Sequence, residues 1–126
     1  MTPIVSKYDL EVARSLPRAV IFFWVNWSIP AIQSRAVVEQ AKLLDQAFPL
    51  AIPYFVADVS DQSGELWDAL REWLQADDTA TEQAAWAGSG ALLWLRAGKV
   101  VHQMIDPMNY APADIVAVSK KVFSSV

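Results

Sequence analysis

The chain has 126 residues, of which 54% are hydrophobic and 19% are charged, and its formal net charge is −4. This length and apolar content exclude a disordered chain and predict a single domain over residues 1–126 whose core needs no cross-links. Phosphate contacts require clustered lysine and arginine, but Lys120–Lys121 is the only adjacent basic pair. We therefore do not expect nucleic acid as a partner.

The chain contains no cysteine and a single histidine, His102. These counts exclude disulfides, thiolate metal sites, a cysteine nucleophile and a metal site built from several histidines. The acidic residues Asp58, Asp61 and Asp77–Asp78 lack the spacing of a calcium-binding loop. We expect neither a metal nor a cofactor.

The first residues lack the charged segment and apolar run of a signal peptide. The longest apolar stretch, residues 19–25, is too short to cross a bilayer. We therefore expect a cytoplasmic protein that has no membrane partner.

The first half of the chain alternates between helical and extended patterns. Residues 8–16 have helical spacing and end before Pro17, and the apolar run 19–25 predicts a central strand buried on both faces. After a turn at 26–30, a helix is expected to bury a stripe made of Val37, Ala41, Leu44 and Phe48. Residues 54–59 form the second predicted strand.

The second half predicts further helices and a β-hairpin. A helix over 63–75 is expected to bury Leu66, Leu70, Trp73 and Leu74, and Thr79–Glu82 has the capping-box pattern that opens a short helix. Residues 91–95 and 99–104 form strands joined by a tight turn. A last helix begins near Pro112 and is expected to bury Ile115, Val118 and Val122. The order predicts an α/β fold, with a mixed sheet flanked by helices on both faces.

Two separated segments resemble the thioredoxin family. Residues 21–31, Ile-Phe-Phe-Trp-Val-Asn-Trp-Ser-Ile-Pro-Ala, are similar to that family's central strand and its Trp-Cys-Gly-Pro-Cys turn. Residues 91–101 are similar to its terminal hairpin. The resemblance implies a thioredoxin-like fold over nearly the whole chain, with a helical insertion of about a dozen residues around 62–88.

The same resemblance implies that the family's redox chemistry is lost. Ser28 and Ala31 stand where the family has its two cysteines, Phe22 where many members bury an aspartate, and Gly90 where the family has a cis-proline. A serine hydroxyl cannot replace a thiolate in disulfide exchange. Trp27 and Pro30 match the family's turn, and both shape it rather than react.

Ser28 has a structural and a catalytic interpretation. Its hydroxyl suits the N-cap of the following helix, and we favour that role. The alternative is an enzyme of the glutathione-transferase type, in which such a hydroxyl stabilises a bound thiolate. His102 is expected on an exposed edge away from Ser28, so a Ser–His–acid arrangement is not predicted.

The six tryptophans divide into core and surface candidates. Trp24, Trp73 and Trp94 are expected in the core, whereas Trp67 and Trp86 could serve either the core or an interface. The resemblance places an exposed groove for client peptides between the turn and the 88–90 loop. Its candidate residues are Trp27, Ser28, Ile29, Pro30, Trp86, Ser89 and Gly90.

The leading hypothesis is therefore a non-catalytic module that binds a protein or peptide and has no disulfide oxidoreductase activity. We do not expect an enzyme. The two alternatives are the Ser28 enzyme of the glutathione-transferase type and a structural subunit of a homo-oligomer.

Overall fold

The fold was obtained as a computed structural model, which describes residues 1–46, 51–61, 63–76 and 90–123. Strands and helices follow one another along the chain as β1 Thr2–Ile4, α1 Lys7–Ser15, β2 Arg18–Trp24, α2 Ile29–Gln46, β3 Tyr54–Asp58, α3 Glu65–Ala76, β4 Ala91–Arg96, β5 Lys99–Ile105, the 3-10 turn η1 Pro107–Asn109 and α5 Pro112–Phe123.

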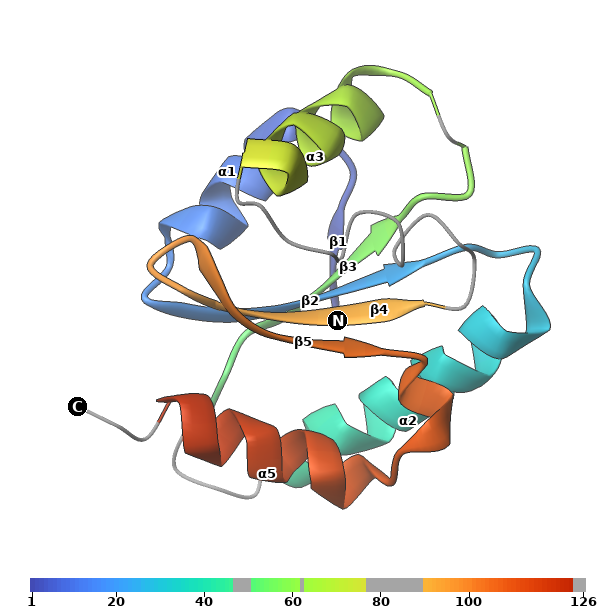
Figure 1. The fold of residues 1–126 in the computed structure, drawn as a ribbon, viewed down its shortest axis with the longest axis vertical. Helices are drawn as coiled ribbons and strands as arrows, with labels where there is room; N and C mark the ends of the chain where they lie inside the picture. The colour runs from blue at the N-terminus through green and yellow to red at the C-terminus, as the bar shows by residue number, and fades with distance from the viewer. Residues whose placement is uncertain (47–50, 62, 77–89, 124–126) are drawn as a thin grey trace.

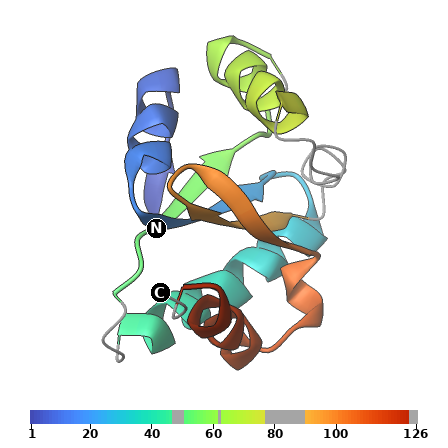
Figure 2. The ribbon, with the colours of Figure 1, turned by 60° about the vertical axis from the view of Figure 1, so that its left-hand side comes forward.

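The strands form one mixed sheet in the order β1-β3-β2-β4-β5. β3 pairs in parallel with β1 and β2, whereas β4 pairs antiparallel with β2 and β5. α1 and α3 cover one face of the sheet and α2 and α5 cover the other (Figure 1; Figure 2). The predicted α/β architecture, with helices on both faces, is confirmed.

β2 lies at the centre of the sheet, and its side chains alternate between the two faces. Ala19, Ile21 and Phe23 are buried toward α1 and α3, whereas Val20 and Phe22 are buried toward α2 and α5. This double burial is what the apolar run predicted, because a strand covered on both faces has no side that can remain polar.

The buried face of α2 differs from the predicted stripe. Ala41 is buried as expected, but Val37 is only partly buried, Leu44 is 44% exposed and Phe48 lies outside the described residues. The core face instead consists of Ala31, Ser34, Val38, Ala41 and Asp45. Hydrophobic periodicity misassigned the face because two of its members are polar.

α5 shows the same kind of correction. Ile115 is buried as predicted, but Val118 and Val122 are only partly buried. The other buried positions are Val116, Ser119 and Phe123. The indole Nε1 of Trp94 donates a hydrogen bond to the Ser119 hydroxyl at 2.9 Å, so a polar residue occupies the core face.

α3 follows the sequence prediction closely, with Leu70, Trp73 and Leu74 buried and Leu66 partly buried. The short helix expected from Thr79–Glu82 lies outside the described residues. Among the described helices, none is long and apolar enough to cross a membrane.

Two features of the strands escaped the sequence prediction. β1 has only three residues and contains Pro3, so it carries no alternating pattern, yet it pairs with β3. At the β4–β5 turn, Gly98 has φ +81°, and a Cβ there would lie 2.7 Å from the carbonyl oxygen of Arg14. The hairpin tip therefore packs directly on the backbone at the end of α1.

Candidate functional site

The turn between β2 and α2 is held by a helix cap. The Ala31 N–H donates to the Ser28 hydroxyl oxygen at 3.3 Å, and the Ile32 N–H donates to the Ser28 carbonyl at 3.0 Å. Pro30 stands in the first turn of α2, where a missing N–H costs no helical bond. Ser28 therefore acts as the N-cap of α2.

Three large apolar side chains around this cap face solvent. Trp27 is 63% exposed, Ile29 70% and Ile32 48%, whereas Ala31 between them is fully buried. Helical spacing explains the division, because Ile29 and Ile32 lie three residues apart on one side of α2. We call Trp27, Ile29 and Ile32 the α2-start surface.

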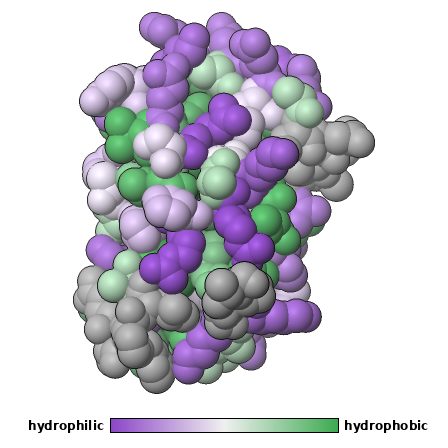
Figure 3. All heavy atoms as spheres, turned by 90° about the vertical axis from the view of Figure 1, so that its left-hand side faces the viewer, coloured by the Kyte–Doolittle hydropathy of each residue, from purple (hydrophilic) through white to green (hydrophobic). Residues whose placement is uncertain are grey.

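The opposite end of the sheet, which carries the β4–β5 turn, differs from the α2-start surface in its hydropathy. Figure 3 looks onto that end, where hydrophilic and hydrophobic residues are intermixed across the visible surface.

Phe22 and Gly90, which were singled out separately in the sequence, lie in contact. Gly90 has φ +89°, and a Cβ there would lie 3.1 Å from the Phe22 ring and 3.4 Å from Cβ of Ser34. The Phe22 side chain is fully buried and carries no group that can transfer a proton. The ring therefore fills the space under Gly90, and the two residues form one packing unit.

Ser34 and Asp106 also lie in this region, and the sequence patterns did not indicate either of them. The Met108 N–H donates to the Ser34 hydroxyl at 3.0 Å, and the Asp106 N–H donates to the Gly90 carbonyl at 3.3 Å. Asp106 has φ 54°, and its buried Oδ1 has no hydrogen-bond partner within the described part of the chain. The Asp-Pro pair at 106–107 is a turn signal that could have revealed it.

Within the described part of the chain, the candidate base His102 does not lie next to Ser28. His102 is exposed on β5, which β4 separates from β2, and its ring meets the Trp94 ring edge-on at 5.3 Å. Among the described residues, no group of three or more histidine, aspartate or glutamate side chains could hold a metal ion. Trp86 and Ser89, predicted for the far wall of the groove, lie outside the described residues.

The predicted core tryptophans are confirmed except for one. Trp94 and Trp73 are buried, whereas Trp24 is only partly buried. The Arg35 guanidinium lies 4.4 Å from the centre of the Trp24 ring, and its Nε is 3.1 Å from Glu39 Oε1. Trp24 is therefore a partly exposed cation–π partner, which a position within a buried strand did not indicate.

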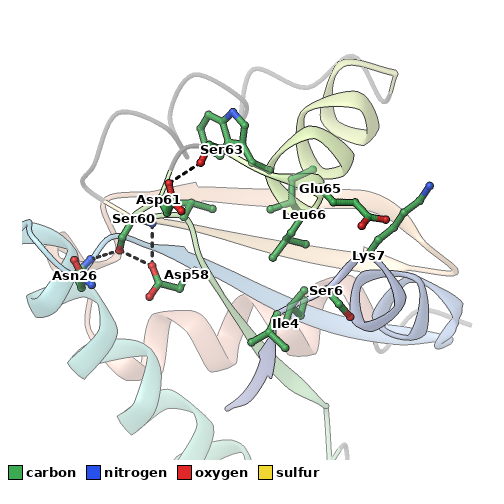
Figure 4. Close-up of a pocket in the computed structure, with 14 residues that line it drawn as sticks. Ile4, Ser6, Lys7, Asn26, Asp58, Ser60, Asp61, Ser63, Glu65 and Leu66 are labelled. Atoms are coloured by element: carbon green, nitrogen blue, oxygen red, sulfur yellow. Dashed lines mark hydrogen bonds between the residues drawn. The ribbon is translucent and has the colours of Figure 1, made fainter.

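A separate cleft of about 570 Å³ lies where β1 and β3 end and α1 and α3 begin (Figure 4). Its polar groups bond to one another: the Asn26 N–H donates to the Ser60 hydroxyl oxygen at 2.7 Å, and Ser60 donates to Asp58. Ser63 donates to Asp61 at 2.7 Å in the same loop. These bonds hold the loop after β3, so the carboxylates there serve local structure.

No protein-family model matches the sequence, and no curated protein matches it. Solved structures do share its fold. The oxidised thioredoxin of Plasmodium falciparum has a TM-score of 0.63 at 10% identity, over 97% of each chain. Thioredoxin f2 of Chlamydomonas reinhardtii has a TM-score of 0.63 at 8% identity, over 100% of this chain and 99% of its own. The reduced Schistosoma mansoni thioredoxin has a TM-score of 0.60 at 15% identity, over 95% of each chain.

These similarities extend over nearly the full length of both chains, so the protein has the thioredoxin fold. Within that fold it is a thioredoxin-like chain that contains no cysteine.

Proposed function

We propose that this protein is a non-catalytic binding module whose α2-start surface docks a protein or peptide partner. The observation that supports the proposal is the exposure of Trp27, Ile29 and Ile32 around a turn that has no cysteine. A cluster of exposed large apolar side chains is typical of an interaction surface, and tryptophan is a frequent energetic anchor of interfaces.

The packing beneath the surface supports binding rather than catalysis. Ser28 caps α2, and the fully buried Phe22 ring lies directly under Gly90. Neither arrangement offers a nucleophile next to a base. The Ser28 cap fixes the first turn of α2, which carries Ile29 and Ile32, and a side chain on a fixed backbone loses less conformational entropy on binding. The cytoplasmic location expected from the sequence remains a prediction.

The test is affinity capture from a lysate of the source organism, read by mass spectrometry. We expect the double substitution of Trp27→Ala and Ile29→Ser to reduce capture of specific partners at least about tenfold, because such anchors carry much of the binding energy. Tyr8→Ala is the matched control, since Tyr8 is 72% exposed on α1. Equal capture by the double variant and the control would contradict the proposal.

A second measurement addresses the Ser28 enzyme. Calorimetry with glutathione at millimolar concentration should give no binding heat for the wild-type protein. Heat that is lost in Ser28→Ala would favour the enzyme and count against a purely non-catalytic module.

A further inference from the structure

β5 forms one edge of the sheet, and no strand among the described residues pairs with its outer side. The strand runs for seven residues and exposes Val101 to 40% and Ile105 to 43%. Natural sheets blunt such edges with charges, prolines, β-bulges or very short strands. Among the residues of β5 only Lys99 is charged and none is proline. The β4–β5 register shifts between Trp94 and Leu95, which leaves Val101 as an extra residue on β5. From His102 to Ile105 the strand is regular, and this part of the edge therefore has the properties of a pairing site.

A groove of about 410 Å³ lies beside this edge, between β5 and α5. It is lined by His102, Gln103, Met104, Tyr110, Asp114, Ala117 and Val118. β5 leads through η1 into α5, so the two elements run side by side in opposite directions (Figure 1). The start of α5 is consequently level with the end of β5, and the middle of α5 with His102.

We propose that this edge is the interface of a two-fold homodimer, in which β5 pairs antiparallel with β5 of a second copy. The register is centred on His102, so that Val101 of one copy lies opposite Gln103 of the other. The five-stranded sheets of the two copies become one continuous sheet, and α5 of one copy lies along α5 of the other.

The charges on α5 explain why the occupant is a second copy. Asp114 and Lys121 are both exposed and lie seven residues, or two helical turns, apart, so they share one side of α5 with Ala117 between them. A two-fold axis makes the paired helices antiparallel, which brings Asp114 of each copy opposite Lys121 of the other. The small Ala117 side chain lets the helices approach at the centre.

One two-fold axis can relate both the paired β5 strands and the paired α5 helices. The midpoint between Asp114 and Lys121 falls at Ala117 and Val118, and these two residues line the same groove as His102. An axis through His102 of β5 thus also passes between the two copies of α5. An unrelated extended peptide would pair with the strand but would leave the charge pattern of α5 unused.

Because the chain has no native cysteine, a single introduced cysteine can test the register directly. Residues opposite each other in an antiparallel pair have Cα atoms about 4.5–5.5 Å apart, within the span of a disulfide. We expect His102→Cys to form a disulfide-linked dimer rapidly on mild oxidation. Glu11→Cys, on the exposed side of α1, is the control that should form no disulfide-linked dimer. Cross-linking of both variants at the same rate would overturn the proposal.

Light scattering coupled to gel filtration tests the unmodified protein. We expect a mass near twice 14.0 kDa at high concentration. Lys121→Glu should raise the dissociation constant about tenfold or more, because it places two like-charged pairs across the axis. Lys120→Glu makes the same charge change on another side of α5 and should change dimerisation little. A wild-type monomer at several hundred micromolar, or equal weakening by both variants, would overturn the proposal.

The dimer interface and the α2-start surface share no residue, so the two proposals fail independently. Loss of partner capture in Trp27→Ala/Ile29→Ser would leave the mass of the protein unchanged.

Discussion

The two faces of the sheet bury cores of different chemistry. Among the described residues, no polar or charged residue is buried on the face that α1 and α3 cover. Toward α2 and α5, three buried polar residues, Ser34, Asp45 and Ser119, stand among the apolar ones. One strand, β2, supplies both cores, so the difference lies in the helices that cover them.

Trp94 and Trp73, the tryptophans buried among the described residues, illustrate the effect of this difference. Trp94 donates its Nε1 hydrogen to Ser119, whose hydroxyl in turn donates to the Ile115 carbonyl at 3.1 Å. On the other face, Trp73 Nε1 is buried without a hydrogen-bond partner in the described structure, and the Arg14 guanidinium lies 4.8 Å from the centre of its ring. Directional bonds thus fix α5 against the sheet, whereas α1 and α3 are held mainly by shape and apolar burial.

Polar groups can thus determine the placement of helices in a largely apolar protein. On the α2–α5 face, burial raises the pKa of Tyr54 to about 12 and also raises the pKa of the Asp45 carboxyl. Stability should therefore respond to pH through this face.

The largest expected effect concerns the phenylalanines of β2, which are both fully buried on opposite faces. Phe22→Ala and Phe23→Ala should each lower the free energy of unfolding by about 3–5 kcal/mol, because each leaves a cavity in a packed core. Urea denaturation measures both. A loss below about 1 kcal/mol for either variant would show that its face is loosely packed.

The next effect concerns the contact between Gly90 and Phe22. Gly90→Ala should cost about 2–4 kcal/mol, because a side chain at φ +89° is strained and its Cβ would press on the Phe22 ring. Phe22→Leu in the same chain should relieve part of that loss. Strict additivity of the two substitutions in a double-mutant cycle would contradict the packing unit.

A smaller effect is expected for the hydrogen bond of Trp94. Ser119→Ala should cost about 1–2 kcal/mol, because it leaves a buried indole N–H without an acceptor. Trp73→Phe removes the buried indole N–H on the other face. Because that N–H has no partner in the described structure, its removal should lower the free energy of unfolding by less than the loss of the Trp94–Ser119 bond does. Equal losses from the two N–H groups would remove the distinction between the faces.

The smallest effect is a change in pH dependence at Asp45. Burial raises the pKa of this carboxyl above its ordinary value of 3.8, outweighing the Ile52 N–H and the positive charges of Arg18 and Lys120. The folded state therefore binds the Asp45 proton more tightly than the unfolded state does. The stabilisation of the fold by this proton is complete below the unfolded pKa and is lost as pH rises through the folded pKa.

Asp45→Asn keeps an acceptor for the Ile52 N–H, which lies 3.2 Å from Asp45 Oδ2. The stability of the wild type relative to this variant should therefore fall as pH rises from about 4 toward neutrality. Thermal unfolding at a series of pH values measures it, and a difference that is constant or rises with pH would contradict the direction of the shift.

Much of the fold could be predicted because its strongest signals are local. The apolar run 19–25 indicated a strand covered on both faces, and Ser28 had the position and chemistry of a helix cap. β1 could not be predicted, since its hydrogen bonds come from β3, far along the chain. The buried faces of α2 and α5 were predicted only in part, because Asp45 and Ser119 are buried through partners that the local sequence does not reveal.

The candidate site was less accessible from sequence. Exposure of Trp27 followed from its place in the turn, but the α2-start surface required the orientation of α2 as well. Phe22 and Gly90 were noted only as separate substitutions, because their contact joins β2 to the start of β4. Asp106 adopts a left-handed conformation that depends on the path of the chain after β5.

The close approach of Gly98 to Arg14 also bears on the order of folding. The hairpin tip and the end of α1 are far apart in sequence, and such contacts form late because they close a long loop. Although α1 is made early in synthesis, its last turn gains its backbone neighbour only once the hairpin exists. We expect the amide hydrogens at the end of α1 to become protected from exchange together with those of β4 and β5, later than those of the middle of α2.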